Sequence, residues 1–95
     1  MAAYLIANVD VTDPAAYEEY RQLVPAIIAA HGGRYLARGG ATEWLEGPVQ
    51  PRRMVVLEFP SLAQLKAFYD SPEYQRVAAV RQRTSHSSLL AVEGL

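Results

Sequence analysis

Two segments of this chain are apolar on both faces of an extended strand. Side chains of a strand alternate between two faces, and in Arg53–Phe59 the apolar residues Val55, Leu57 and Phe59 alternate with apolar Met54 and Val56. Leu89 and Ala91 alternate with Leu90 and Val92 in the same way. An antiparallel sheet with one face in water would instead alternate apolar and polar residues. These strands therefore need a cover on both faces, and this need most limits what the chain can fold into.

The residues around these two strands predict the order β-α-β-β-α-β. Ala3–Val11 alternates with period 2, and Pro14–His31 carries an apolar stripe at helical spacing that continues past Pro25. Further predicted elements are a strand at 33–38, its continuation or a hairpin arm at 42–46, helices opening at Ser61 and Ser71, and a last strand at 87–93. This order predicts an α+β fold, a four-stranded antiparallel sheet with both helical units on one face.

The second face of this sheet is expected to be covered by another copy of the chain. A chain of 95 residues forms one domain, residues 1–95, and its core is modest, so self-association would add useful burial. Two sheets meeting face to face would form a barrel-like homodimer, with a space left between each sheet and its helices. On the first strand, the face of Tyr4, Ile6, Asn8 and Asp10 is the expected partner surface.

Four short runs of the chain form a recognisable pattern: Phe59-Pro60-Ser61, the seven residues from Tyr69 to Gln75, His31-Gly32-Gly33-Arg34-Tyr35-Leu36, and Glu46-Gly47. Together they resemble a bacterial family called domain of unknown function 1330. The resemblance extends from Tyr4 to Gly94. It implies a ferredoxin-like fold that pairs into a dimeric α+β barrel, and it implies no particular reaction. Related barrel dimers include monooxygenases, isomerases and dehydratases.

Composition excludes several classes of site and partner. The chain has no cysteine, which excludes disulfides, thiol nucleophiles and iron–sulfur clusters. Its net charge is −1 with the charges spread along the chain, so we expect no nucleic-acid partner. No apolar run approaches the roughly 20 residues of a membrane span, and we expect a cytoplasmic protein without a membrane partner. Motifs for phosphate, metal or nucleophilic chemistry are absent, so we expect no cofactor and no metal.

Polar residues on otherwise apolar strand faces are the candidate site. If Met54 and Val56 face the barrel, then Glu58 does so too, and Asn8 lies on the matching face of the first strand. We expect one partly buried cavity lined by Asn8, His31, Arg38 and Glu58, with Trp44 or Arg81 at its rim. Here His31 or Glu58 would act as the base, and the other residues would bind the ligand or hold an oxyanion.

A structural role remains open for the main candidates. Glu58 could meet water or form a structural salt bridge at its strand end, and His31 could stabilise the dipole at the end of its helix. Trp44 could pack at the dimer interface. Two functions therefore remain. The first is a cofactor-free enzyme, similar to a monooxygenase, isomerase or dehydratase, that acts on a small, partly apolar organic molecule. The second is a non-catalytic ligand-binding or structural homodimer.

Overall fold

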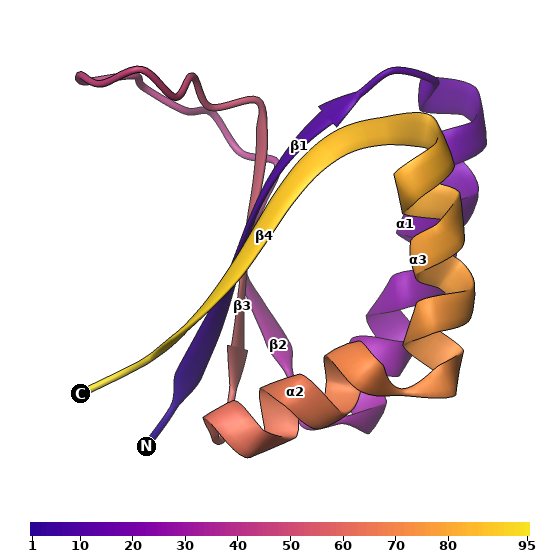
Figure 1. The fold of residues 1–95 in the computed structure, drawn as a ribbon, viewed down its shortest axis with the longest axis vertical. Coiled ribbons are helices and arrows are strands. Elements are labelled where there is room, and N and C mark those ends of the chain that lie inside the picture. The colour runs from indigo at the N-terminus through magenta and orange to yellow at the C-terminus, as the bar shows by residue number, and fades with distance from the viewer.

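The computed structural model describes residues 1–95 and has the predicted order of elements, with the second helical unit split in two. The elements are β1 (Ala3–Val11), α1 (Pro14–Ala30), β2 (Arg34–Arg38), β3 (Arg53–Phe59), α2 (Leu62–Asp70), α3 (Pro72–Thr84) and β4 (Ser85–Glu93). All three helices lie on the same side of the sheet (Figure 1). The fold is therefore the expected ferredoxin-like α+β arrangement.

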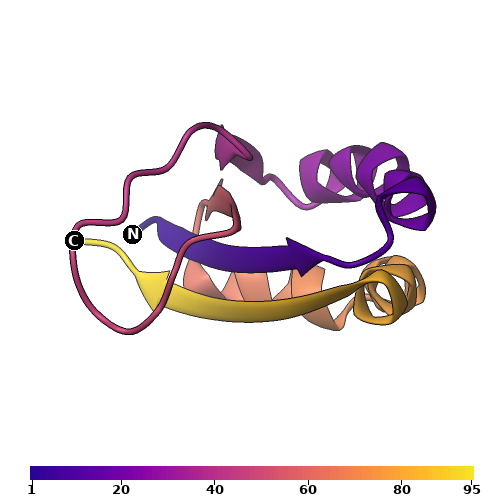
Figure 2. The same ribbon diagram turned by 90° about the horizontal axis from the view of Figure 1, so that it is seen from above.

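The sheet is antiparallel throughout and has the strand order β2-β3-β1-β4. β1 lies in the middle, where Leu5 is paired with Leu57 of β3 on one side and with Ala91 of β4 on the other. β2 and β4 form the two edges, and the view from above shows α1 and α3 to one side of the strands (Figure 2). The pairing register fixes which side chains share a face of the sheet.

Local sequence accounts for where the helices begin. Asp13, Ser61 and Ser71 each use a side-chain oxygen to accept a backbone N–H three residues later, which satisfies an otherwise unpaired helix donor. Helix α1 continues through Pro25 as one element, as predicted, and Gly32 follows its end with φ +79°. No helix is long and apolar enough to cross a membrane.

The core lies between the helices and one face of the sheet, which we call the inner face. Its members alternate along the strands with side chains of the opposite, outer face, as the period-2 pattern predicts. Ala3, Leu5, Ala7, Val9, Leu57 and Phe59 contribute the strand side of this core, and Tyr17, Val24, Ile28, Leu65, Phe68, Tyr74, Val77 and Ala78 contribute the helix side. The outer face carries Ile6, Val56, Leu90 and Val92, and no helix covers it (Figure 1).

Residues 39–52, which we call the arm, leave the sheet as an extended loop on the side away from the helices (Figure 1). The predicted strand or hairpin arm at 42–46 is therefore wrong, because this segment has no regular structure and its side chains are exposed. Gly39 and Gly47 adopt positive φ angles of 68° and 102°, which turn the backbone out of a strand conformation. The last strand begins at Ser85, two residues earlier than predicted, because Ser85 already pairs with Val11.

Candidate functional site

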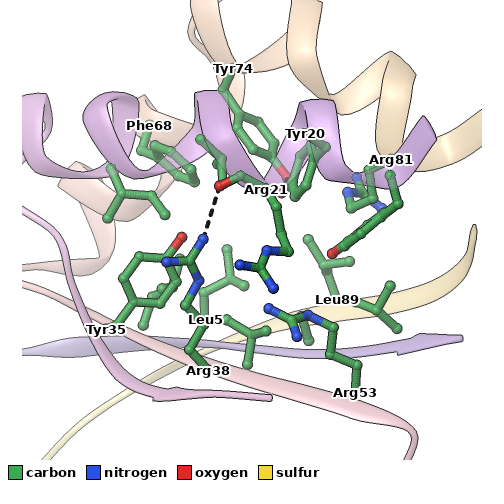
Figure 3. Close-up of a pocket in the computed structure, with 17 residues that line it drawn as sticks. Leu5, Tyr20, Arg21, Tyr35, Arg38, Arg53, Phe68, Tyr74, Arg81 and Leu89 are labelled. Atoms are coloured by element: carbon green, nitrogen blue, oxygen red, sulfur yellow. Dashed lines mark hydrogen bonds between the residues drawn. The ribbon is translucent and has the colours of Figure 1, made fainter. Parts of the chain in front are cut away.

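A cavity of about 40 Å³ lies between α1, α3 and the inner face of the sheet (Figure 3). Thirteen of the 17 residues that line it are hydrophobic, and they come from all four strands and all three helices. A cavity of this size holds about three water molecules. Its lining is like that of a ligand site, in which apolar walls surround a few polar groups, but its volume admits only part of a ligand.

The polar groups in this cavity are arginines and tyrosines. Four guanidinium groups line it, from Arg21, Arg38, Arg53 and Arg81, together with the tyrosines Tyr17, Tyr20, Tyr35 and Tyr74. No aspartate, glutamate, histidine or lysine is among the lining residues. The cavity therefore collects positive charge and hydroxyl donors without a carboxylate of its own.

Arg81 is the most deeply buried charged residue of the site. It lies in the last turn of α3 and is only 5% exposed. Its Nη1 donates to Ser87 Oγ of β4 at 2.5 Å, whereas its buried Nε has no hydrogen-bond partner within the chain. Burial by itself lowers the pKa of this guanidinium, but the nearby oxygens of Tyr74, Tyr20 and Tyr69 raise it above its usual value. Arg81 is thus a fixed positive charge.

Arg53 approaches the same cavity from the first position of β3. It shares the inner face with Val55 and Leu57, and its Nε is also buried without a hydrogen-bond partner. The backbone of Gly39 packs directly against its guanidinium, and a Cβ at this glycine would collide with it. Burial raises the pKa of Tyr17, while the neighbouring Arg53 charge opposes that increase. Arg53 therefore faces inward and has close neutral neighbours.

Two tyrosines join α1 to α3 above the cavity. The hydroxyl oxygens of Tyr20 and Tyr74 lie 3.0 Å apart, and their rings meet edge to face. Burial, followed by the proximity of Tyr74, raises the pKa of Tyr20 far above its usual value. At neutral pH this hydroxyl is therefore protonated, so that it can donate a hydrogen bond but cannot act as a base.

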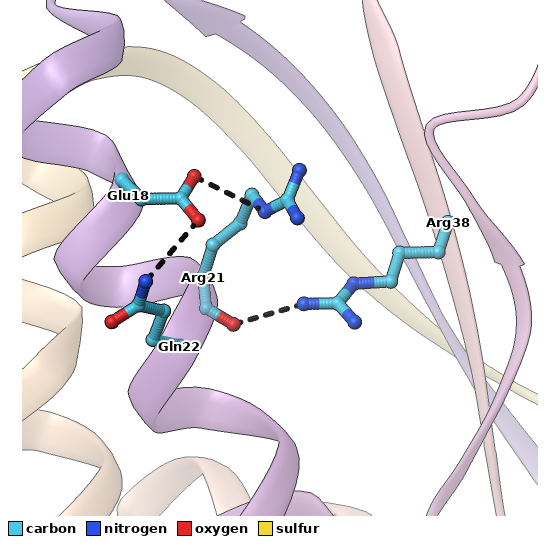
Figure 4. A network of polar contacts seen from close by, with 4 residues as sticks. All are labelled: Glu18, Arg21, Gln22 and Arg38. Atoms are coloured by element: carbon cyan, nitrogen blue, oxygen red, sulfur yellow. Dashed lines mark hydrogen bonds and ion pairs between the residues drawn. The ribbon is translucent and has the colours of Figure 1, made fainter.

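Arg21 and Arg38 lie at the mouth of the cavity. Arg38 Nη2 donates to the backbone oxygen of Arg21 at 2.9 Å, and its guanidinium stacks over the Tyr35 ring. Arg21 in turn lies 3.5 Å from a carboxylate oxygen of Glu18 on the surface of α1 (Figure 4). Both arginines are exposed, and their long side chains can move more easily than that of buried Arg81.

The structure does not bring the predicted site residues into one cavity within the chain. Asn8 and Glu58 share the outer face, as the strand alternation predicted. Glu58 forms an ion pair with exposed Arg34 at 2.7 Å. The Asn8 side chain accepts from the Arg52 N–H at 2.8 Å and donates to the Gln50 oxygen at 3.1 Å, so that it ties down the end of the arm.

Arg38 and Arg81 instead face the inner cavity, on the other side of the sheet. Strict alternation from Arg34 would put Arg38 on the outer face with Glu58. The pairing of β2 with β3 shifts between Tyr35 and Ala37, and this bulge places Arg38 opposite Val55 on the inner face. The prediction of one cavity shared by Asn8, Arg38 and Glu58 is therefore wrong for the single chain.

His31 and Trp44 lie away from both groups. His31 follows the end of α1, where Nδ1 lies 2.9 Å from the Ile27 oxygen and the ring packs edge-on against Phe68. This contact occupies one ring nitrogen, and the histidine does not line the inner cavity. Trp44 lies in the arm and is 51% exposed. The catalytic and binding roles of all six residues stay predictions.

The sequence also held a cavity residue that the site prediction missed. Arg53 occupies the strand position that alternates with Val55 and Leu57, so that the period-2 pattern alone places it on the inner face. Tyr17, Tyr20 and Tyr74 lie among the apolar positions of their helices, a pattern that by itself indicates only packing in the core. The meeting of Tyr20 and Tyr74, 54 positions apart, has no local sequence signal.

The family of the chain follows from its sequence. The family described as "Domain of unknown function (DUF1330)" matches residues 2–95. The chain belongs to this family. Its function is not thereby given, and no protein of curated function matches the sequence.

Solved structures with the same fold include proteins of known and of unknown function. A Rhodopseudomonas palustris protein of unknown function has a TM-score of 0.79 at 19% identity, over 99% of this chain and 82% of that one. SnoaB, a cofactor-independent oxygenase from Streptomyces nogalater, has a TM-score of 0.68 at 14% identity, over 99% and 93%. A dimeric ferredoxin-like protein of unknown function from Jannaschia sp. has a TM-score of 0.73 at 14% identity, over 99% and 100%. At such identities the likeness is one of fold alone.

Proposed function

We propose that this member of the DUF1330 family is a small cofactor-free enzyme that acts on a small, partly apolar organic molecule in the inner cavity. The observation that carries the proposal is the cavity itself, where apolar walls surround buried Arg81 and several hydroxyl groups. A cofactor-independent oxygenase has the same fold, which makes oxygen chemistry a reasonable reaction to test.

The cavity groups suit the stabilisation of an oxyanion. When an enolisable ketone or a phenol loses a proton, negative charge develops on oxygen, and a fixed guanidinium nearby lowers the energy of that anion. Arg81 supplies such a charge in an enclosed place, and the protonated Tyr20 supplies a hydrogen-bond donor. The reaction class is thus proton transfer from the substrate to water, since no lining residue can act as a base, with or without subsequent addition of dioxygen to the enolate or phenolate.

A second candidate function is ligand binding without catalysis. It is favoured by one observation: the cavity has no carboxylate, histidine or lysine that could remove a proton. The predicted bases, His31 and Glu58, do not line it. Under this candidate the arginines only bind and orient the ligand.

Hydrogen–deuterium exchange separates the two candidates. The probe is 2-tetralone, an enolisable ketone, in D₂O with no cofactor added; NMR follows the loss of its α-protons, and an electrode follows oxygen uptake. The enzyme proposal expects exchange above the buffer rate that is lost in Arg81→Gln and kept in Arg83→Gln, whose arginine is exposed. Binding without exchange or oxygen uptake supports the second candidate, and the absence of binding by any small molecule rejects both.

We further propose that the chain works as a homodimer joined through the outer face, and its cytoplasmic location remains a prediction. Leu90 is 57% exposed on this face, and Ile6, Val56 and Val92 continue the same apolar surface. The arm carries three more exposed apolar side chains, Trp44, Leu45 and Val49, on the side of the sheet away from the helices (Figure 1). A dimeric protein with this fold is among the neighbours.

Light scattering coupled to size exclusion tests the dimer. The wild type is expected to elute with twice the mass of the chain at micromolar concentration. Val56→Glu places a charge on the outer face and should produce a monomer, whereas Gln22→Glu on exposed α1 should leave the dimer intact. A wild-type monomer would reject the barrel arrangement.

A further inference from the structure

We infer that the ligand of the inner cavity is a small organic carboxylate with an apolar body, and that Arg53 and Arg81 together hold its carboxylate group. This inference rests on the proposed function and narrows its substrate class: the carboxylate occupies Arg81, and the Tyr20 hydroxyl is left as the donor to a developing oxyanion. One end of the ligand would contact the guanidinium groups, and the other end would contact the apolar wall.

The first argument is a charge imbalance in a buried place. Arg53 and Arg81 each have a buried Nε without a hydrogen-bond partner in the chain, and neither forms an ion pair. A buried guanidinium is normally paired with an acid, because removing an unpaired charge from water is unfavourable. Their close neighbours are the neutral hydroxyls of Ser87, Tyr74 and Tyr17. A negative group from outside the chain is the missing partner.

Arginines elsewhere in the chain show that the sequence can supply such partners. Arg34 on the outer face meets Glu58 at 2.7 Å, and Arg21 at the cavity mouth meets Glu18 at 3.5 Å. In both cases a side chain of the pair is at least partly exposed, where an ion pair contributes little. The two most enclosed arginines, for which a carboxylate partner would matter most, are the ones left without it.

The second argument is that buried Arg81 and half-buried Arg53 are each in contact with other parts of the chain before any ligand arrives. Ser87 accepts from Arg81 Nη1 across the gap between α3 and β4. Gly39, which has a positive φ, lies against the Arg53 guanidinium, and a Cβ at Gly39 would force that guanidinium to shift. Groups held in place lose little conformational entropy on binding, which is typical of a built recognition site.

The shape and lining of the cavity favour a carboxylate over inorganic phosphate. Guanidinium groups bind a planar carboxylate through two parallel hydrogen bonds, and one carboxylate can meet two arginines. Most of the remaining wall is apolar, including Leu5, Val24 and Leu89, and would leave the other oxygens of a phosphate dianion unpaired. The cavity admits only a small group, so the apolar body meets the apolar wall only in part and extends out of the cavity past exposed Arg21 and Arg38.

Calorimetric titration with matched ligands tests the inference. Benzoate carries the charge, benzamide is its neutral counterpart of the same shape, and inorganic phosphate and chloride are anions without an apolar body. We expect benzoate to bind at least about tenfold more tightly than benzamide, as is usual when a hydrogen bond to a charged group is lost. Phosphate and chloride are expected to bind more weakly than benzoate.

Two pairs of neighbouring arginines supply matched variants. Arg53→Gln and Arg81→Gln should each weaken benzoate binding about tenfold or more, whereas Arg52→Gln and Arg83→Gln should leave it unchanged, because Arg52 and Arg83 are exposed and do not line the cavity. Without ligand, the two cavity variants should melt at the wild-type temperature or above it, because an unpaired buried charge is removed. If a glutamine variant does not fold, Arg81→Lys, which keeps the charge and loses the planar fork, replaces it and should also weaken binding.

The outcomes separate this inference from the proposed function. Benzamide binding as tightly as benzoate would overturn the carboxylate inference and leave a cavity for neutral ligands, as the proposed function allows. Phosphate or chloride binding as tightly as benzoate, or an equal loss in Arg52→Gln, would also overturn it. Failure of every ligand, neutral or charged, would reject the proposed function as well.

Discussion

The inner and outer faces of the sheet are built from the same strands, yet they differ in what covers them and in how they treat charge. The inner face is covered by three helices and carries Arg53 and Arg81, neither of which has an ion-pair partner. The outer face lies open, and its main charged residue, Glu58, is paired with Arg34. Burial alone would favour paired charges on the inner face and unpaired charges on the outer one, because burying a charge without a partner is unfavourable.

This difference shows where the chain carries residues that do not serve the stability of the fold. Neighbouring residues in sequence fall into opposite environments, as Arg52 and Arg53 show: the first is exposed and the second reaches the cavity. A core that served stability alone would place an apolar side chain at Arg53 and Arg81. The two arginines that interrupt the apolar pattern of the inner face therefore mark the candidate site.

The largest expected effect comes from removing an aromatic ring on the inner face. Phe59 is 1% exposed and packs against Phe68, so Phe59→Ala should lower the free energy of unfolding by about 3–5 kcal/mol. Leu90→Ala on the outer face should lower it by less than about 1 kcal/mol in dilute protein. Urea unfolding at concentrations where the midpoint no longer depends on concentration measures both. Equal losses would mean that the outer face is covered within the single chain.

A smaller effect is expected from adding a methyl group beside the same ring. A Cβ at Gly33 would lie 2.6 Å from Phe59 Cε1 and 2.8 Å from Ile28 Cγ2, so Gly33→Ala should destabilise the fold by about 1–3 kcal/mol. Gly40 in the arm has open space around it, and Gly40→Ala should change stability by less than about 0.5 kcal/mol. Thermal unfolding compares the two; a Gly33→Ala protein as stable as the wild type would contradict close packing at this position.

On the outer face, Asn8→Ala should loosen the arm and leave the core unchanged. The Asn8 side chain accepts a hydrogen bond from the Arg52 N–H. Loss of this bond should lower the free energy of exposing that amide to solvent by about 1 kcal/mol, so that its hydrogen exchange becomes about fivefold faster. The Gly39 N–H at the other end of the arm donates to Met54 and should exchange at its wild-type rate. NMR follows both amides in one sample. Unchanged exchange at Arg52 would show that Asn8 does not hold the arm.

The smallest effect concerns the response of the inner face to alkaline pH. Burial raises the pKa of Tyr20 above the ordinary 10.0, so its contribution to stability is complete below about pH 10 and is lost as pH rises toward the folded-state pKa. Tyr20→Phe loses the hydrogen bond to Tyr74 and should cost about 1 kcal/mol or less at neutral pH. The variant should then lose less stability than the wild type between about pH 9 and about pH 11 in urea titrations. An equal loss of stability in the variant and the wild type would mean that groups other than Tyr20 cause the sensitivity to alkaline pH.

Much of the fold could be predicted from local patterns. Period-2 alternation assigned Leu5 and Leu57 to the inner face and Val56 to the outer one, because each strand residue has only two sides to choose from. Asp13, Ser61 and Ser71 marked helix starts through a short-range hydrogen bond. The family resemblance was confirmed over nearly the whole chain.

The candidate site was harder to predict because it depends on register and on distant contacts. A bulge at Leu36, where neither glycine nor proline signals a break, moved Arg38 to the face opposite Glu58. Asn8 looked like a ligand-binding residue on an apolar face, and its polar atoms are used by the arm instead. The cavity joins residues of seven elements, and only the packed fold brings them together.

The double hydrogen bond of Asn8 has a consequence for how this protein can vary. It fixes Gln50 and Arg52 where the arm rejoins the sheet, and the bond from the Gly39 N–H to the Met54 oxygen fixes the point where the arm leaves. With both ends clamped, the length of the segment between them is decoupled from the register of β2 and β3. Each doubling of a flexible loop adds only about 0.6 kcal/mol to the entropy of closing it. Evolution and engineering alike can therefore lengthen, shorten or replace residues 41–49, or graft a new peptide there, while the cavity behind the sheet keeps its shape.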